Sequence, residues 1–359
     1  MKVLIAAGGT GGHIYPGIAI AKEILRRDTD SEVLFVGTAR GIETRIVPDN
    51  GFQLTLINSA GLKNVGFVGK LKGMLILPKS FLEAREILKD FRPDVVVGAG
   101  GYVSGPVLLT AHFMGFPTLV MDSNAFPGFT NRRLARFVDK AALTFEEAMP
   151  FFGNKGIVTG NPVRREFFEV PQKARGDMTN LLIFGGSQGS VAINNAMLAA
   201  LPFLRDQAST MTITHQTGEA NYEDVRSRYN ETEWTNADIR PYISDIAHEF
   251  AKADLIVCRA GATTCAEIAA AGKAAIMIPL PAAADDHQRK NAEAMERAGA
   301  ARMILQKNLD GEALANCINE FLDSPESITE MEQAAKRLAK ANAAGATVDL
   351  IEELSVARG

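Results

Sequence analysis

The chain has 359 residues, of which 47% are hydrophobic and 22% charged, the composition of a globular protein long enough for two domains. Its net charge of -4 gives no general basic field, so overall charge does not support nucleic-acid binding. Its three cysteines, at positions 258, 265 and 317, fit neither a zinc site nor a disulfide framework, and we expect reduced, buried thiols. The apolar run Val3–Ala7 is far shorter than the ~20 residues that span a bilayer, and no other run reaches that length. We therefore expect a soluble protein, or one that lies on a membrane surface.

Short apolar runs alternate with helical patterns along the whole chain. The first series of predicted strands is Val3–Ala7, Glu32–Val36, Leu54–Ile57, Val95–Gly98, Thr118–Met121 and Lys140–Thr144. The second series is Asn180–Phe184, Thr210–Thr214, Ile239–Pro241, Leu255–Cys258 and Ala275–Pro279. The predicted helices between and after them include Ile18–Arg27, Lys79–Lys89, Thr130–Phe137, Val191–Leu201, Ile246–Ala251, Cys265–Ala271, Gln288–Ala298, Met331–Ala343 and Ala346–Leu354. Such alternation predicts parallel sheets covered by helices on both faces.

Three glycine clusters, Gly8–His13, Gly98–Tyr102 and Gly185–Ser190, each follow a predicted strand. The first and third open the two strand series, so we predict two doubly wound domains. A glycine turn that leads into a helix brings backbone N–H groups and the positive end of the helix dipole to an anion such as a diphosphate. The G-x-x-x-x-G-K-[ST] loop of nucleoside triphosphatases is absent, and no acidic residue closes Glu32–Val36 as in many dehydrogenases.

A Gly-Asn-Pro turn at 160–162 marks the predicted boundary between the domains. We expect an N-terminal domain over residues 1–160, joined by a C-terminal helix at 341–359, and a C-terminal domain over residues 161–340. Two Rossmann-like α/β domains that face a cleft indicate the glycosyltransferase-B fold.

Polar side chains of the second half have two interpretations each. Glu267 either complements a helix dipole or accepts both hydroxyls of a ribose. Gln288 and Asn291 share a helix face, which is either a solvated helix start or a reader of sugar hydroxyls. The neighbouring Asp285 and Asp286 are typical of a helix cap, and we predict no metal site and no cofactor.

Several motifs together resemble the MurG family. They are G-G-T-G-G-H at 8–13, G-G-Y-V-S-G-P at 100–106, T-G-N-P-V-R at 159–164, G-G-S-Q-G at 185–189, and the stretch from Arg259 to Glu267 that continues to D-D-H-Q-x-x-N at 285–291. The resemblance covers essentially the whole chain. It implies an inverting transfer of N-acetylglucosamine from UDP-N-acetylglucosamine to the C4 hydroxyl of undecaprenyl-linked N-acetylmuramyl-pentapeptide. This step of peptidoglycan synthesis, from lipid I to lipid II, implies a peripheral protein on the cytoplasmic face of the bacterial inner membrane.

The resemblance also implies roles for individual residues. Donor contacts are implied for Thr10, Gly11, Gly12, Asn124, Arg164, Ser187, Gln188, Ile243, Ala262, Thr264, Glu267, Gln288 and Asn291. Among these, Ile243 would meet the uracil through its backbone, and Glu267 would hold the ribose. Acceptor contacts are implied for Tyr102 and Ser104, and the acceptor-facing domain is the N-terminal one.

One motif departs from the family, in which His-Glu commonly precedes the asparagine. Here the residues are Met121, Asp122, Ser123 and Asn124, so the imidazole is lost. His13 becomes the better candidate for the general base, although it could merely orient its loop, and Asp122 is the competing base. Charge on the departing UDP would fall on the helix starts at 187–190 and 262–264 and on Arg164, which could also be an ordinary surface arginine.

The segment Leu62–Leu82 combines apolar residues with Lys63, Lys70, Lys72 and Lys79 and contains no acidic residue. Such a segment suits contact with an anionic membrane surface, although a core helix with a solvated edge is the more common outcome. Three functions stay open: the lipid-linked transferase, a transferase with another acceptor or an epimerase of related fold, and a nucleotide-binding oxidoreductase. No nucleic-acid partner is expected.

Overall fold

The computed structural model describes the whole chain except residues 40, 60–66, 174–175, 177, 233 and 358–359. The described residues form two compact units, Met1–Val163 with Asn342–Gly359 and Arg164–Ala341. No helix in this part of the chain is both long enough and apolar enough to cross a bilayer.

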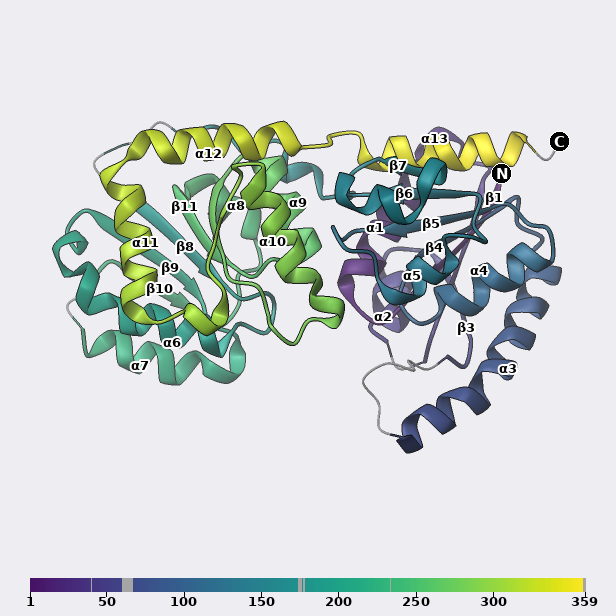
Figure 1. The fold of residues 1–359 in the computed structure, drawn as a ribbon, viewed down its shortest axis with the longest axis horizontal. Coiled ribbons are helices and arrows are strands. Elements are labelled where there is room, and N and C mark those ends of the chain that lie inside the picture. Colours follow the sequence, from purple (N-terminus) through teal and green to yellow (C-terminus); the bar gives the residue numbers. More distant parts are fainter. Residues whose placement is uncertain (40, 60–66, 174–175, 177, 233, 358–359) are drawn as a thin grey trace. The chain divides into compact units, whose positions relative to one another are not determined.

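The N-terminal unit is built on a seven-stranded parallel sheet in the order β3-β2-β1-β4-β5-β6-β7 (Figure 1). Its strands are β1 (Lys2–Ala7), β2 (Glu32–Gly37), β3 (Gln53–Leu56), β4 (Val95–Gly100), β5 (Thr118–Asp122), β6 (Lys140–Leu143) and β7 (Gly156–Val158). Its helices are α1 (Gly11–Arg27), α2 (Glu43–Asp49), α3 (Phe67–Phe91), α4 (Ser104–Phe113), α5 (Phe129–Leu134) and α13 (Ala343–Val356). The order reverses between β1 and β4, the place where open α/β sheets bind ligands at the carboxyl ends of their strands.

Successive side chains of β1 pack into the hydrophobic cores on the two opposite faces of this sheet. Val3 and Ile5 pack with α1 and α13, whereas Leu4 and Ala6 pack with α3 and α4. Because successive side chains of a strand point to opposite faces, a continuous apolar run is needed wherever helices cover both faces. The C-terminal helix α13 thus completes the core of the N-terminal unit.

The C-terminal unit is built on a six-stranded parallel sheet in the order β10-β9-β8-β11-β12-β13. Its strands are β8 (Thr179–Phe184), β9 (Met211–Gln216), β10 (Ala237–Arg240), β11 (Leu255–Cys258), β12 (Ala274–Met277) and β13 (Arg302–Met303). Its helices are α6 (Val191–Ala200), α7 (Tyr222–Asn230), α8 (Ile246–Lys252), α9 (Ala262–Ala271), α10 (His287–Arg297), α11 (Gly311–Asp323) and α12 (Pro325–Leu338). The order of this sheet reverses between β8 and β11.

Each predicted strand overlaps an observed one, while the short edge strands β7 and β13 were not predicted. The largest helix error is α3, which begins at Phe67 rather than at Lys79. The next largest is α1, which begins at Gly11 rather than at Ile18. Glycines and Pro16 mask the helical periodicity of its first turns. In the structure, Gly11, Gly12 and His13 therefore form the first turn of α1 and are not part of a loop.

Candidate functional site

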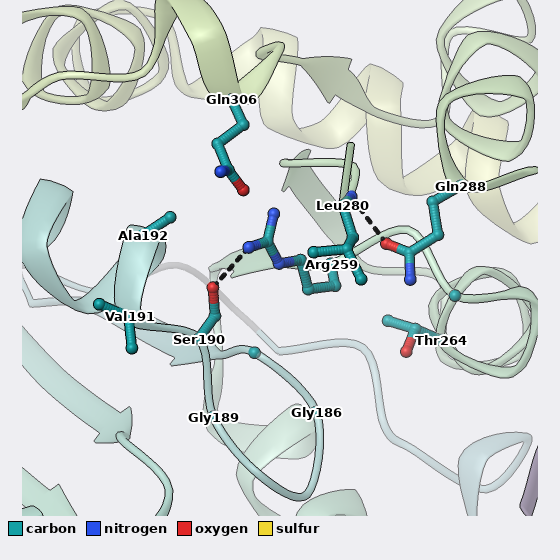
Figure 2. Close-up of a pocket in the computed structure, with 12 residues that line it drawn as sticks. Gly186, Gly189, Ser190, Val191, Ala192, Arg259, Thr264, Leu280, Gln288 and Gln306 are labelled. Atoms are coloured by element: carbon teal, nitrogen blue, oxygen red, sulfur yellow. Dashed lines mark hydrogen bonds between the residues drawn. The ribbon is translucent and has the colours of Figure 1, made fainter. Parts of the chain in front are cut away.

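A hollow of about 580 Å³ lies at the carboxyl ends of β8 and β11, where the sheet order of the C-terminal unit reverses (Figure 2). It is lined by Gly185, Gly186, Gly189, Ser190, Val191, Ala192, Arg259, Gly261, Thr264, Leu280, Gln288 and Gln306. The lining includes the starts of α6 and α9, so backbone N–H groups of two helices face the same space. This arrangement can hold a diphosphate.

The glycine turn 185–190 has a shape that only glycine permits. Gly186 and Gly189 have φ of 92° and 72°, and a Cβ on Gly189 would fall 1.9 Å from the carbonyl oxygen of Thr217. Ser190 caps α6 by accepting from the backbone N–H of Ile193. The predicted residues Ser187 and Gln188 are exposed on this turn, beside the lining of the hollow rather than in it.

Arg259 places a positive charge in the middle of the hollow (Figure 2). Its Nη2 donates to Ser190 Oγ at 2.7 Å and its Nη1 to the carbonyl oxygen of Ile278 at 3.0 Å. Burial lowers the pKa of Arg259, which reflects the cost of removing this charge from water. Gln306 points toward Arg259, and its side-chain oxygen has no hydrogen-bond partner among the described residues. An anionic ligand in the hollow would offset the positive charge of Arg259.

Glu267 lies in the second turn of α9, with its side chain 14% exposed. Nη2 of Arg164 lies 3.8 Å from its carboxylate, and Arg164 also pairs with Glu166 at 2.8 Å. Burial raises the pKa of Glu267 to about 7, against the opposing effect of Arg164. The guanidinium of Arg164 also stacks over Phe167, 5.0 Å from the ring centroid, which holds it in place.

The other predicted donor contacts divide into lining and supporting residues. Thr264 and Gln288 both line the hollow, and Gln288 Oε1 accepts from the N–H of Leu280 at 3.0 Å. Asn291 is fully buried, and its Nδ2 donates to the carbonyl oxygen of Ala260, so it supports the turn before α9. Ala262 is the first residue of α9, and Ile243 is buried in the loop after β10. The structure therefore brings Thr264 and Gln288 together and places Asn291 behind them.

The predicted cap of α10 differs in detail. Asp285 and Asp286 both have positive φ, and Asp286 occupies the cap position without a side-chain bond to the helix backbone. Asp286 instead pairs with Arg289 one turn later. Within the described residues, no group of three or more histidine, cysteine, aspartate or glutamate side chains could bind a metal ion.

In the N-terminal unit, the turns after β1 and β4 meet. The N–H of Gly8 donates to the carbonyl oxygen of Gly100, and Gly100 has φ of 123°. A Cβ on Gly100 would lie 2.2 Å from Nδ1 of His13, so the imidazole packs directly on this glycine. Tyr102 is exposed, whereas Ser104 is fully buried and its hydroxyl bonds to the backbone of Ala6 and Gly100. Ser104 therefore holds the turn rather than reaching the surface.

Asp122 ends β5 with its side chain almost fully buried. Its carboxylate accepts from the N–H groups of Asn124 and Gly128 and from Nδ2 of Asn131, at 2.8 to 3.0 Å. Burial raises the pKa of Asp122, and these bonds together with the charge of nearby His13 oppose the shift. Since its oxygens are occupied by donors from its own loop, Asp122 organises the segment that carries Asn124. His13 is more accessible than Asp122.

Comparison with known proteins places this geometry in a family. The N-terminal domain of glycosyltransferase family 28 matches residues 3–143, and its C-terminal domain matches residues 180–346. The UDP-N-acetylglucosamine--N-acetylmuramyl-(pentapeptide) pyrophosphoryl-undecaprenol N-acetylglucosamine transferase of Geobacter sulfurreducens is 47% identical, over 97% of both chains. The protein of that name from an Anaeromyxobacter species is 48% identical, over 99% of this chain and 93% of its own. The crystal structure of Acinetobacter baumannii MurG has a TM-score of 0.82 at 33% identity and covers 98% of this chain and 99% of its own.

The chain belongs to the MurG family. It is therefore a glycosyltransferase with two parallel-sheet α/β units of the glycosyltransferase-B fold, as predicted from the sequence. This decides against the epimerase and oxidoreductase alternatives.

Two residues that line or support the sites were given no role of their own in the sequence analysis. They are Arg259, which stands directly after β11, and Glu43. Glu43 is 0% exposed at the start of α2. Its carboxylate accepts from the N–H of Gly9 at 3.1 Å and from the N–H and hydroxyl of Thr38 at 2.9 Å. An acid at a helix start is usually a surface feature, so the sequence gives no sign of this burial.

We expect the Glu43→Ala variant to lose about 2–4 kcal/mol of unfolding free energy. The substitution leaves the N–H groups of Gly9 and Thr38 without their acceptor and opens a cavity between Gly8 and Gly37, which both approach Glu43 closely. Urea unfolding followed by circular dichroism measures the change. Glu32→Ala is the control, because that exposed strand residue should shift stability by less than about 0.5 kcal/mol. Equal stability of the two variants would contradict the assignment.

Proposed function

We propose that this protein transfers N-acetylglucosamine from UDP-N-acetylglucosamine to the C4 hydroxyl of undecaprenyl-diphosphate-linked N-acetylmuramyl-pentapeptide. A bond forms between the acceptor oxygen and the anomeric carbon, the bond from that carbon to the diphosphate breaks, and the hydroxyl proton passes to a base. The products are the β-1,4-linked lipid disaccharide and UDP. The observation that carries this proposal is the hollow with two helix starts and Arg259, in a chain 47% identical to transferases of this name.

The C-terminal unit binds the donor in this proposal. The diphosphate lies against the starts of α6 and α9, where the N–H groups, Arg259 and the linker residue Arg164 offset the negative charge that grows on UDP. Glu267 accepts the ribose hydroxyls, and Gln288 contacts the sugar. Arg259 is held by Ser190 and Ile278 before the donor arrives, so little reorganisation of this charge accompanies the reaction.

The N-terminal unit binds the acceptor and supplies the base. His13 in the first turn of α1 takes the C4 proton, since an imidazole exchanges protons near neutral pH and this one is only half-buried. Asp122, whose oxygens are held by Asn124, Gly128 and Asn131, keeps the neighbouring loop in shape. Tyr102 is exposed on the turn beside His13 and contacts the acceptor.

The direct test is turnover with radiolabelled UDP-N-acetylglucosamine and a soluble lipid I analogue. We expect a labelled disaccharide lipid and one UDP per transfer, with UDP-glucose as a poor donor. Hydrolysis or epimerisation of the donor without disaccharide formation would contradict the proposal.

A peripheral position on the cytoplasmic face of the inner membrane follows from a lipid-linked acceptor. The proposed contact is Leu62–Leu82, of which residues 62–66 and the side chains of residues 67–76 lie outside the described part of the chain. In the described end of this segment, within α3, Leu82 is 62% exposed and Lys79 pairs with Glu83 at 3.7 Å. The same unit carries a basic surface around a hollow of about 420 Å³, lined by Arg132, Arg133, Ala135, Arg136, Phe151, Phe152 and Lys155. Both features suit an anionic surface.

We expect the double variant Lys70→Glu and Lys72→Glu to bind vesicles containing 30% anionic lipid at least tenfold less well, at about 1 kcal/mol for each basic residue near the surface. Sedimentation with vesicles measures the bound fraction. The matched control reverses two exposed lysines of the C-terminal unit, Lys307 and Lys340, and should bind as the wild type does. Equal loss in both double variants would indicate a general charge effect.

A further inference from the structure

Gln216 is the last residue of β9, the strand between β8 and β10. In the sheet register it lies beside Phe184 at the end of β8 and Arg240 at the end of β10. The residue is only 4% exposed. From this position it can reach the loops that follow both neighbouring strands.

The side-chain amide of Gln216 joins these two loops. Its Nε2 donates to the carbonyl oxygen of Gly186 at 2.7 Å, and its Oε1 accepts from the N–H of Ile243 at 2.9 Å. Gly186 lines the hollow in which the diphosphate is proposed to bind, and Ile243 is the proposed contact of the uracil. One amide therefore bonds to the main chain at both the proposed diphosphate site and the proposed uracil site.

Other hydrogen bonds hold the two residues that follow Gln216. The N–H groups of Thr217 and Gly218 donate to the carbonyl oxygens of Arg240 and Pro241. On the other side, Nδ2 of Asn194 in α6 donates to the carbonyl oxygen of Thr217 at 3.0 Å. Loss of the amide would therefore remove its contacts to Gly186 and Ile243 while the bonds of Thr217 and Gly218 stay in place.

We propose that Gln216 is a positioning residue that sets the preference of the donor site for uracil over cytosine. This inference rests on the proposed function. Uracil presents an N–H at N3 and an oxygen at C4, whereas cytosine presents an acceptor and an amino group there, so a peptide held at one position distinguishes them. Only an amide of this length donates to Gly186 and accepts from Ile243 at once.

The experiment measures the dissociation constants of UDP and CDP by calorimetry for the wild type and for Gln216→Met, which keeps the side-chain length but removes both hydrogen bonds. We expect UDP to bind on the order of tenfold more weakly and the preference for UDP over CDP to fall by a similar factor. A folded Gln216→Met protein with unchanged UDP affinity and preference would overturn the inference. If the wild type itself does not distinguish UDP from CDP, the assignment of the uracil site in the proposed function fails instead.

The control is Asn180→Leu, which removes an equally bonded amide at the opposite, amino end of β8, where Asn180 bonds to Asp254 and Thr212. This variant should lose stability but keep the UDP preference, and loss of preference there would overturn the inference as well.

Gln216→Glu is the substitute variant if Gln216→Met does not fold. Its carboxylate still accepts from Ile243 but faces the oxygen of Gly186, so we expect UDP to lose affinity relative to uridine while uridine keeps its preference over cytidine. Wild-type UDP affinity in Gln216→Glu would also overturn it.

Discussion

The His13→Ala variant is expected to lower kcat for sugar transfer by roughly 10²–10⁴-fold while the dissociation constant of UDP stays near that of the wild type. In our proposal His13 takes the acceptor proton in the transition state and makes no essential contact to the nucleotide. Single-turnover kinetics with a soluble lipid I analogue measure the chemical step, and calorimetry measures UDP binding. The contrast between the two is the signature of a base.

The control for His13 is His248→Ala, because His248 is an exposed histidine of the C-terminal unit and should leave both quantities unchanged. Near-normal kcat in His13→Ala would remove His13 as the base and return that role to Asp122. A large loss of stability in His13→Ala would point instead to its packing on Gly100. Thermal unfolding of the variant separates these two cases.

The Glu267→Ala variant is expected to weaken UDP binding on the order of 10²-fold, the upper range for hydrogen bonds to a charged group. If Glu267 binds the ribose hydroxyls, the affinity should also depend on the 2′-hydroxyl. The wild type should prefer UDP to 2′-deoxy-UDP, and Glu267→Ala should lose this preference. Calorimetry with both nucleotides measures the effect.

The matched control is Glu312→Ala, because Glu312 is an exposed acid in the first turn of α11. A carboxylate that only complements a helix dipole contributes a few tenths of a kcal/mol. If Glu267→Ala changed UDP binding no more than Glu312→Ala does, the dipole interpretation would stand and the ribose assignment would fall.

The raised pKa of Glu267 also gives this interaction a pH dependence. At about 7, against an ordinary value of 4.5, the folded protein holds this proton more tightly than the unfolded chain does. Folding stability from this group therefore falls as pH rises from about 4.5 to about 7. Ribose hydroxyls favour the carboxylate, so UDP should bind with proton release and with lower affinity below pH 7. Calorimetry at pH 6 and pH 8, in buffers of different ionisation enthalpy, measures the protons released.

The positions of the main strands and the two-domain fold class could be predicted because they depend on patterns within a few residues. Val3–Ala7 and Leu255–Cys258 are apolar throughout, as strands buried on both faces must be. Glycine turns that follow such strands predicted where each sheet can bind a ligand. The early start of α1 was missed because glycines weaken the local helical signal.

The partners within the sites were decided by tertiary structure alone. Arg259 bonds to Ser190, Gln216 joins Gly186 to Ile243, and Glu43 holds Gly9, in each case across 27 to 69 residues of sequence. The burial of individual side chains could not be predicted from the sequence either. Ser104 and Asn291 are both fully buried, although their motifs suggested ligand contacts. The physical reason is that local sequence fixes which segments form strands and helices, whereas the order of parallel strands decides which of their ends meet.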